Sequence, residues 1–226
     1  MADPRQRLEA VPGDRGADDA SQPVGAPAGT TRTLILAAAL HRFAEQGFAA
    51  ASLTDIAADV GIRRPSLLHH FPSKEALYRE VLLAELADWN SLVSVAIVGG
   101  TGGWEKAERV LVAAFEYFEK HPDFVRITRR EALDGGPMLS EELGAVLRPM
   151  FDGAVVFLER EMDAGRLRRY DARQLLLTGY GAVLSYLSDA PLAGDLLGSD
   201  PLSASMLAAR RRHVLDLLRN ALDPSA

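Results

Sequence analysis

Apolar residues recur every three to four positions along most of the chain after Thr31, which is the spacing of one buried face on an α-helix. The first such face consists of Leu34, Ala37, Ala38, Leu40 and Phe43. Gly47 is placed to end this helix, since glycine is the residue most often found just after a helix C-terminus. No stretch alternates apolar and polar residues as a half-buried strand does, so the pattern predicts an all-α fold.

Two short helices are predicted directly after the first one. Ser52 can cap a helix over residues 52–60, because its side-chain oxygen can accept from a free backbone N–H. Gly61 then supplies a sharp turn. A second helix is predicted over residues 64–71, with Pro65 in its first turn, where a missing N–H costs little. Two short helices joined in this way form a helix-turn-helix, for which an ordinary αα-hairpin is the alternative.

Longer helices follow. The pattern predicts helices at about 74–97, 104–120, 122–134, 140–163, 171–188 and 201–221. Ser73 is placed to cap the first of them. Glycine and proline separate the others, and no helix is predicted over residues 191–201. Residues 1–29 contain four prolines, four glycines and few large apolar groups, so a disordered tail is expected there.

The composition excludes several classes of protein. The 226 residues are 48% hydrophobic and 25% charged, which is ordinary for a globular chain. Cysteine is absent, so there is no disulfide, no zinc–thiolate site and no cysteine nucleophile. No segment reaches the roughly 20 apolar residues of a membrane span, and the N-terminus lacks the apolar centre of a secretory signal. We therefore expect a cytoplasmic protein that does not enter a membrane.

The charge distribution favours one region for binding a polyanion. The net charge of −6 argues against a nucleic-acid-binding protein, but residues 30–80 carry six basic and five acidic side chains. Arg63 and Arg64 lie where the second short helix begins, although a helix N-terminus carries roughly half a positive charge. A local conflict of this kind is typical of a functional site, and DNA phosphate would resolve it.

Residues 33–78 resemble the N-terminal domain of TetR-family transcriptional regulators. The resemblance rests on the segments AALHRFAEQGF, SLTDIAADVGI and HHFPSKEALY. It implies a ligand-responsive repressor that binds a palindromic DNA operator as a homodimer, without enzymatic activity, cofactor or metal. The implied division is a tail (1–29), a helix-turn-helix domain (30–78) and a ligand-sensing and dimerisation domain (79–226).

The resemblance also implies a set of DNA contacts. They are Ser52, Thr54, Arg63, Arg64, Pro65, Ser66, His69, His70 and Lys74. Arg64 is the candidate for guanine recognition and Lys74 for a phosphate. Two positions depart from the family pattern. Arg63 cannot cap its helix as a small polar residue would, and Leu68 stands where many members have an aromatic side chain.

Two further surfaces are predicted in the C-terminal part. Helix 171–188 is apolar on almost every side, which requires burial on more than one face. The predicted dimer interface consists of Leu176, Gly179, Val183, Leu207, Val214 and Leu218, although these residues could instead complete a monomeric core. The predicted effector pocket consists of Trp89, Phe115, Phe118, Ile127, Met150, Phe151 and Tyr180, each of which could also be plain core. Nearby arginines at 126, 129 and 130 could face an anionic ligand or form salt bridges.

Two other functions remain open from the residues alone. Asp55 with Asp59, and Glu131 with Asp134, have the spacing of carboxylate pairs that bind metal or transfer protons. Charged helix faces produce such pairs routinely, and no phosphate-binding loop or dinucleotide fingerprint is present. An all-α enzyme and a helical interaction module that never contacts DNA are therefore the alternatives.

Overall fold

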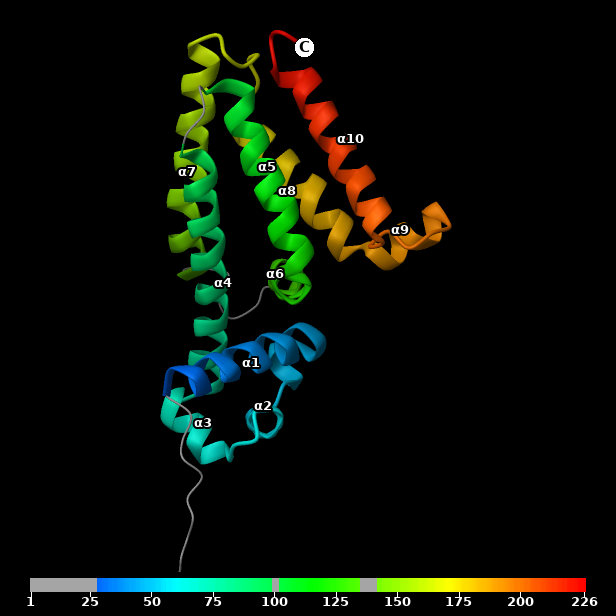
Figure 1. Cartoon of the computed structure of the whole chain (residues 1–226). Coiled ribbons are helices and arrows are strands. Elements are labelled where there is room, and N and C mark those ends of the chain that lie inside the picture. Colours follow the sequence, from blue (N-terminus) through cyan, green and yellow to red (C-terminus); the bar gives the residue numbers. More distant parts are fainter. Residues whose placement is uncertain (1–27, 99–101, 135–141) are drawn as a thin grey trace, which may run out of the picture.

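The computed structural model describes residues 28–98, 102–134 and 142–226, so the predicted tail lies almost wholly outside the described residues. Within these ranges every regular element is a helix, as predicted (Figure 1). The helices are α1 (Ala28–Ala50), α2 (Leu53–Asp59), α3 (Arg64–His70), α4 (Lys74–Ile97), α5 (Gly103–Lys120), α6 (Pro122–Asp134), α7 (Glu142–Asp163), α8 (Ala172–Ser188), α9 (Ala190–Leu197) and α10 (Ala204–Leu222).

The first three helices and the start of α4 share one small core at the lower end of the molecule in Figure 1. Ile35, Phe43, Ile56, Leu67 and Leu77 are fully buried there. The residues come from α1, α2, α3 and α4, so each short helix is held mainly by packing. Short helices need this support, because helices of seven residues are not stable alone in water.

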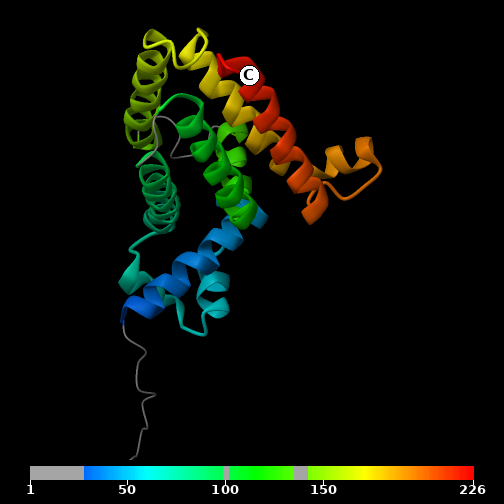
Figure 2. The same cartoon turned by 45° about the horizontal axis from the view of Figure 1, so that its top comes forward.

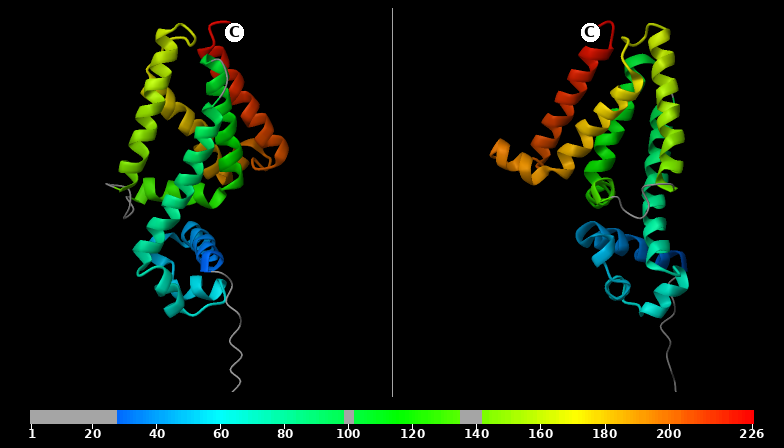
Figure 3. Two further views of the ribbon diagram at one scale, coloured as in Figure 1. Left: turned by 60° about the vertical axis from the view of Figure 1, so that its left-hand side comes forward. Right: turned by 180° about the vertical axis from the view of Figure 1, so that it is seen from behind.

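The long helix α4 continues from this small core into the larger helical body above it (Figure 3). Ser73 caps its start by accepting a hydrogen bond from the backbone N–H of Ala76 at 3.1 Å, as predicted. In the larger body α5 is central and packs against α4, α8 and α10, while α7 packs against α8. Phe115 of α5 and Ile127 of α6 are almost completely buried in this body.

Helix α9 is a correction to the sequence-based prediction, which expected no helix over residues 191–201. Pro191 occupies the first turn, where proline is tolerated, and Gly198 ends the helix with a left-handed φ of 63°. Pro191 and Gly198 therefore lie at the two ends of a helix and not in a loop. Helix α9 projects from the body between α8 and α10 (Figure 2), with Leu192, Leu196 and Leu197 exposed.

Candidate DNA-binding surface and its connection to the helical body

The local geometry of α2 and α3 follows the sequence signals closely. The Ser52 side chain accepts from the Thr54 N–H at 3.2 Å and so caps α2. Gly61 has a φ of 73°, which is the conformation expected for glycine in this turn. Arg63 lies at the N-cap of α3 without a side-chain cap. Pro65, in the first turn, removes one of the N–H groups that a cap would serve.

Burial decides which face of α3 is available to a ligand. Leu67 is fully buried against the small core, and Leu68 and His70 are half-buried. The exposed residues are Arg63, Arg64, Pro65, Ser66 and His69. Leu68, at the position where many family members have an aromatic side chain, is partly buried and packs against the core. The N-terminal half of α3 is thus exposed to solvent and accessible to a ligand.

The arginines of this chain are mostly engaged within the protein, and Arg63 and Arg64 are exceptions. Among the described residues neither guanidinium has an ion-pair or hydrogen-bond partner, whereas Arg42 binds both carboxylate oxygens of Asp59 at 2.6 and 2.7 Å. The hydrogen bonds from Arg42 lower the pKa of Asp59. This pair fastens α1 to α2. Two positive charges at a helix N-terminus therefore remain without an internal counter-charge.

Lys74 lies at the start of α4 and is held in a defined position. Its Nζ donates to the carbonyl oxygens of Ala49 and Ala51, both at 3.1 Å, and lies 4.7 Å from the centre of the Phe48 ring. An ammonium group has three donors, so one remains for a phosphate oxygen. The side chain is only half-buried. Sequence reasoning predicted the phosphate contact but not these internal bonds, which depend on the fold of the α1 C-terminus.

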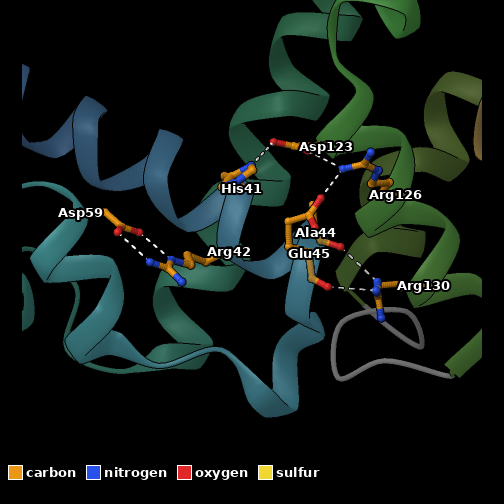
Figure 4. Close-up of polar contacts among 8 residues, drawn as sticks. All are labelled: His41, Arg42, Ala44, Glu45, Asp59, Asp123, Arg126 and Arg130. Carbon is orange, nitrogen blue, oxygen red and sulfur yellow. Dashed lines mark hydrogen bonds and ion pairs between the residues drawn. The ribbon is translucent and has the colours of Figure 1, made fainter. Parts of the chain in front are cut away.

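A row of polar contacts joins α1 to α6 of the helical body (Figure 4). His41 Nδ1 lies 2.9 Å from Asp123 Oδ2, and Arg126 pairs with Glu45. Arg130 donates to the carbonyl oxygens of Ala44 and Glu45. The guanidinium groups of Arg126 and Arg130 thus have partners within the chain, which favours the salt-bridge alternative over an anionic ligand. The third arginine of this group, Arg129, lies 3.9 Å from Asp189.

In each carboxylate pair considered for an enzyme, one carboxylate is bound by a residue outside the pair. Asp59 is bound to Arg42, and Glu131 is buried and accepts a hydrogen bond from the Tyr78 hydroxyl. Among the described residues no group of three or more potential ligands is placed to hold a metal ion.

None of the described helices is long and apolar enough to cross a bilayer.

The residues predicted to line an effector pocket lie in different environments. Phe115, Phe118 and Ile127 are buried, and Trp89, Met150 and Phe151 are half-buried. The Trp89 ring lies 5.1 Å from Phe118, in an aromatic cluster between α4 and α5. Tyr180 is 50% exposed on α8, so its ring is on the outside of the helical body. Tyr180 thus differs in its exposure from the other six residues, which are buried or half-buried.

The residues predicted for the dimer interface also divide into two groups. Val183, Val214 and Leu218 are buried in the chain's own core. Leu176, Gly179 and Leu207 are half-buried. The large apolar residues that stay exposed are Leu177 and Tyr180, three positions apart on α8, and Leu217 on α10. The hydrophobic periodicity predicted the positions of these two apolar helices. It did not predict which of their apolar residues are buried within the same chain and which stay exposed.

Replacing Arg64 with alanine is expected to cost about 1–3 kcal/mol of binding free energy on the preferred DNA sequence and to relax the preference at one base pair. The reason is that an exposed, unpartnered guanidinium can donate two hydrogen bonds to guanine. Fluorescence anisotropy on matched and single-base-altered duplexes measures this. Arg148→Ala removes the same charge from an exposed position on α7 and should leave the preference intact. Equal losses on all sequences for Arg64→Ala would contradict the assignment.

Comparison with protein-family models gives two matches that together span most of the chain. Residues 35–81 match "Bacterial regulatory proteins, tetR family", and residues 105–218 match "Tetracyclin repressor-like, C-terminal domain". The first match contains α2, α3 and Lys74. The second contains α6, α7, α8 and most of α10. The unpartnered arginines therefore lie within the segment that matches a family of bacterial regulators.

Individual relatives agree with the family matches. The HTH-type transcriptional regulator RutR of Escherichia coli K12 is 28% identical over 165 residues, which cover 73% of this chain and 77% of RutR. The HTH-type transcriptional repressor KstR2 of Mycobacterium tuberculosis H37Rv is 41% identical over 100 residues, 44% of this chain and 48% of KstR2.

Solved structures share the fold. The ketosteroid transcriptional regulator KstR2 of Mycobacterium tuberculosis superposes with a TM-score of 0.68 at 22% identity, covering 85% of this chain and 94% of the other. FadR of Bacillus subtilis in complex with stearoyl-CoA gives a TM-score of 0.67 at 18% identity, covering 82% and 96%. At such identities the superpositions establish the fold alone.

Proposed function

The chain belongs to the TetR family of bacterial transcriptional regulators, and we propose that it binds a palindromic operator as a homodimer that an apolar effector releases. Membership makes the protein a helix-turn-helix regulator of transcription and not an enzyme. The proposal adds the symmetry of the operator, the residues that contact it, the dimer surface and the kind of effector.

One observation carries the proposed DNA contact: the exposed, unpartnered Arg63 and Arg64 at the N-terminus of α3. In a helix-turn-helix protein the N-terminal residues of the second helix lie nearest the base edges of the major groove. Arginine is the residue that most often contacts guanine there, through bidentate hydrogen bonds. Ser52, Thr54 and Lys74 flank α3 and are proposed to bind phosphate groups on either side.

Dimerisation is proposed because one α3 helix contacts too few base pairs for a useful specificity. Two copies related by a two-fold axis would contact two half-sites about 34 Å apart. The open apolar face of α8 and α10, with Leu177, Tyr180 and Leu217, is suited to such symmetric contact. Helix α9, which lies between these two helices in the sequence, adds the exposed Leu192, Leu196 and Leu197. Exposed large apolar side chains that form a patch are typical of a protein–protein interface.

An apolar effector is proposed from the side chains of the helical body and from the relatives. Trp89, Leu92, Leu111, Phe151 and Phe157 are only partly buried although they pack against the core. Large ligands of regulators are held by apolar linings of this type, with few polar groups. KstR2 is a ketosteroid regulator, and the FadR structure contains stearoyl-CoA. A fatty acyl or steroid group is therefore the proposed class of effector.

Selection of binding sites from random DNA tests the proposal. We expect an inverted repeat whose half-sites are centred one helical turn, or a multiple of it, apart. Binding to the selected duplex should weaken steeply with salt, since phosphate contacts release counterions. Stearoyl-CoA or a free steroid should then be titrated against the complex, with release from the operator as the expected result. Enrichment of no sequence, or of a single asymmetric site, would contradict the proposed operator.

A further inference from the structure

The C-terminal end of α1 is interrupted at Gly47 and held by two cations from different parts of the chain. Gly47 has a φ of 77°, which breaks the helical path. Before this break, Arg130 of α6 donates to the carbonyl oxygens of Ala44 and Glu45 at 3.1 Å each (Figure 4). After it, Lys74 of α4 donates to the carbonyl oxygens of Ala49, in the last turn of α1, and of Ala51, just beyond the helix. Each cation satisfies carbonyl groups that the broken helix leaves free.

An aromatic cluster fills the space beside the break and supports Lys74. The ammonium group lies over the Phe48 ring, a favourable cation–π arrangement. The centres of the Phe48 and Phe43 rings lie 4.9 and 4.8 Å from that of Tyr78, both edge to face, and 6.1 Å from each other. Such pairs prefer a defined geometry, so a displaced Tyr78 ring would displace Phe48. The ring of Tyr78 therefore helps to place the platform beneath Lys74.

The Tyr78 hydroxyl connects this cluster to α6. It donates to Oε1 of Glu131, which follows Arg130 directly in α6. Glu131 is only 3% exposed, and its other oxygen has no hydrogen-bond partner among the described residues. Loss of the Tyr78 bond would therefore leave a buried carboxyl group without a hydrogen bond from the described residues, which costs free energy of folding. Glu131 and Tyr78 must consequently move together if α6 shifts relative to α4.

We propose that Tyr78 and Glu131 are positioning residues for the phosphate contact of Lys74. They act through Phe48 and the α1 C-terminus, with Arg130 holding the same segment from the side of α6. A displacement of α6 would thus move the ammonium group of Lys74 without any ligand touching the DNA-binding helices. The inference rests on the proposed function, because it requires that Lys74 bind operator phosphate.

The test is a double-mutant cycle on the salt dependence of operator binding. Lys74→Met keeps the side-chain stem and should reduce the slope of log K against log salt by about one, the value of one phosphate contact. Tyr78→Phe removes only the hydroxyl that reaches Glu131. It should lower operator affinity about threefold to tenfold and reduce the slope toward that of Lys74→Met. Once Lys74 is methionine, Tyr78→Phe should cause no further loss, because both changes remove the same contact.

A matched control separates positioning from general stability. Tyr117→Phe also removes one partly buried hydroxyl, which donates to the Glu85 carbonyl oxygen at 2.8 Å, far from Lys74 along α4. It should leave the affinity and the salt slope unchanged. Glu131→Ala is a second variant at the junction: it removes the acceptor of the Tyr78 hydroxyl and should reproduce the reduced slope of Tyr78→Phe. The melting temperature of every variant is measured alongside.

The outcomes are distinct. Additive losses for Tyr78→Phe and Lys74→Met, or a lowered melting temperature with an unchanged slope, would overturn the inference while leaving the proposed function in place. An unchanged slope for Lys74→Met would overturn it as well, since there would be no phosphate contact to position. Failure of the unaltered protein to bind any palindrome would instead overturn the proposed function, and the inference with it.

Discussion

Replacing Leu217 with glutamate is expected to convert the protein to a monomer and to weaken operator binding on the order of a thousandfold. Leu217 is 58% exposed on α10, beside the buried Val214 and Leu218, so the change leaves the chain's own core intact. In a symmetric dimer the new charge would meet its own copy or an apolar partner surface. A monomer also loses the second half-site, and joining two half-sites is worth about 10²- to 10⁴-fold in affinity.

Val156→Glu provides the matched control for this prediction. Val156 is 63% exposed on α7, so the same charge replaces an equally exposed apolar residue outside the proposed interface. Sedimentation velocity should show a monomer for Leu217→Glu and a dimer for Val156→Glu, with full operator affinity retained by the control. A dimeric Leu217→Glu variant, or equal losses for both variants, would show that the subunits meet elsewhere.

The helix-turn-helix region could be predicted from the sequence because its signals are local. Ser52, Gly61, Pro65 and Ser73 each act within a few residues of their own position, and the structure places each where the sequence predicted. Capping, positive φ and the missing proline N–H need no knowledge of distant segments. The resemblance placed Arg63, Arg64, Pro65 and Ser66 at the DNA, and these residues are exposed in the structure, while Leu67 is the buried residue of α3.

Contacts between distant segments could not be predicted in this way. Arg130 meets the α1 carbonyls across 86 and 85 positions, and Tyr78 meets Glu131 across 53. No periodicity specifies such partners, because any helix can place an arginine toward solvent or toward a neighbour. The burial of individual residues on α8 could not be predicted for a related reason. This helix is apolar on several sides, so the sequence alone did not indicate that Val183 is buried in the chain while Tyr180 is half exposed.

Replacing Glu161 with glutamine is expected to lower the free energy of unfolding by about 3–5 kcal/mol, the usual cost of breaking a buried charge pair. Glu161 is 1% exposed near the end of α7. Its carboxylate accepts from Arg166 Nε at 2.6 Å and Nη2 at 2.8 Å, and from the Gly103 N–H at 2.7 Å. A glutamine amide could keep one of these bonds but would turn its NH₂ donors toward the guanidinium, which has only donors itself.

The glycines at the start of α5 make this arrangement possible. A Cβ on Gly102 would lie 2.7 Å from Glu161 Oε2, and Gly102 has a φ of 104°. In the sequence these glycines indicate only a break between two helices, and nothing in the residue pattern around Glu161 indicates a role for it. The pair Gly102–Gly103 is the trace of this contact in the sequence. It could not be interpreted there, because the carboxylate that needs the space lies 58 positions after Gly103. Glu161 therefore ties the start of α5 to the end of α7 and to Arg166.

The effect of Glu161 on stability should depend on pH in a defined direction. Hydrogen bonds from Arg166, followed by that from Gly103, lower the pKa of Glu161 from 4.5 to about 2. A carboxylate with a lowered pKa in the folded state contributes stability that is complete above the unfolded value and is lost as pH falls toward the folded one. Its contribution should thus be complete at pH 6, reduced by about 2 kcal/mol at pH 3, and nearly absent at pH 2.

Urea unfolding of the unaltered protein and Glu161→Gln at pH 6 and pH 3 measures this difference directly. The gap between the two proteins should be about 2 kcal/mol smaller at pH 3, because the wild-type carboxylate then contributes less. Glu159→Gln makes the same chemical change two residues earlier, at an exposed position of α7, and should stay within about 0.5 kcal/mol of the unaltered protein. A gap that is the same at both pH values would mean that the packing of the side chain, rather than its charge, holds α5 and α7 together.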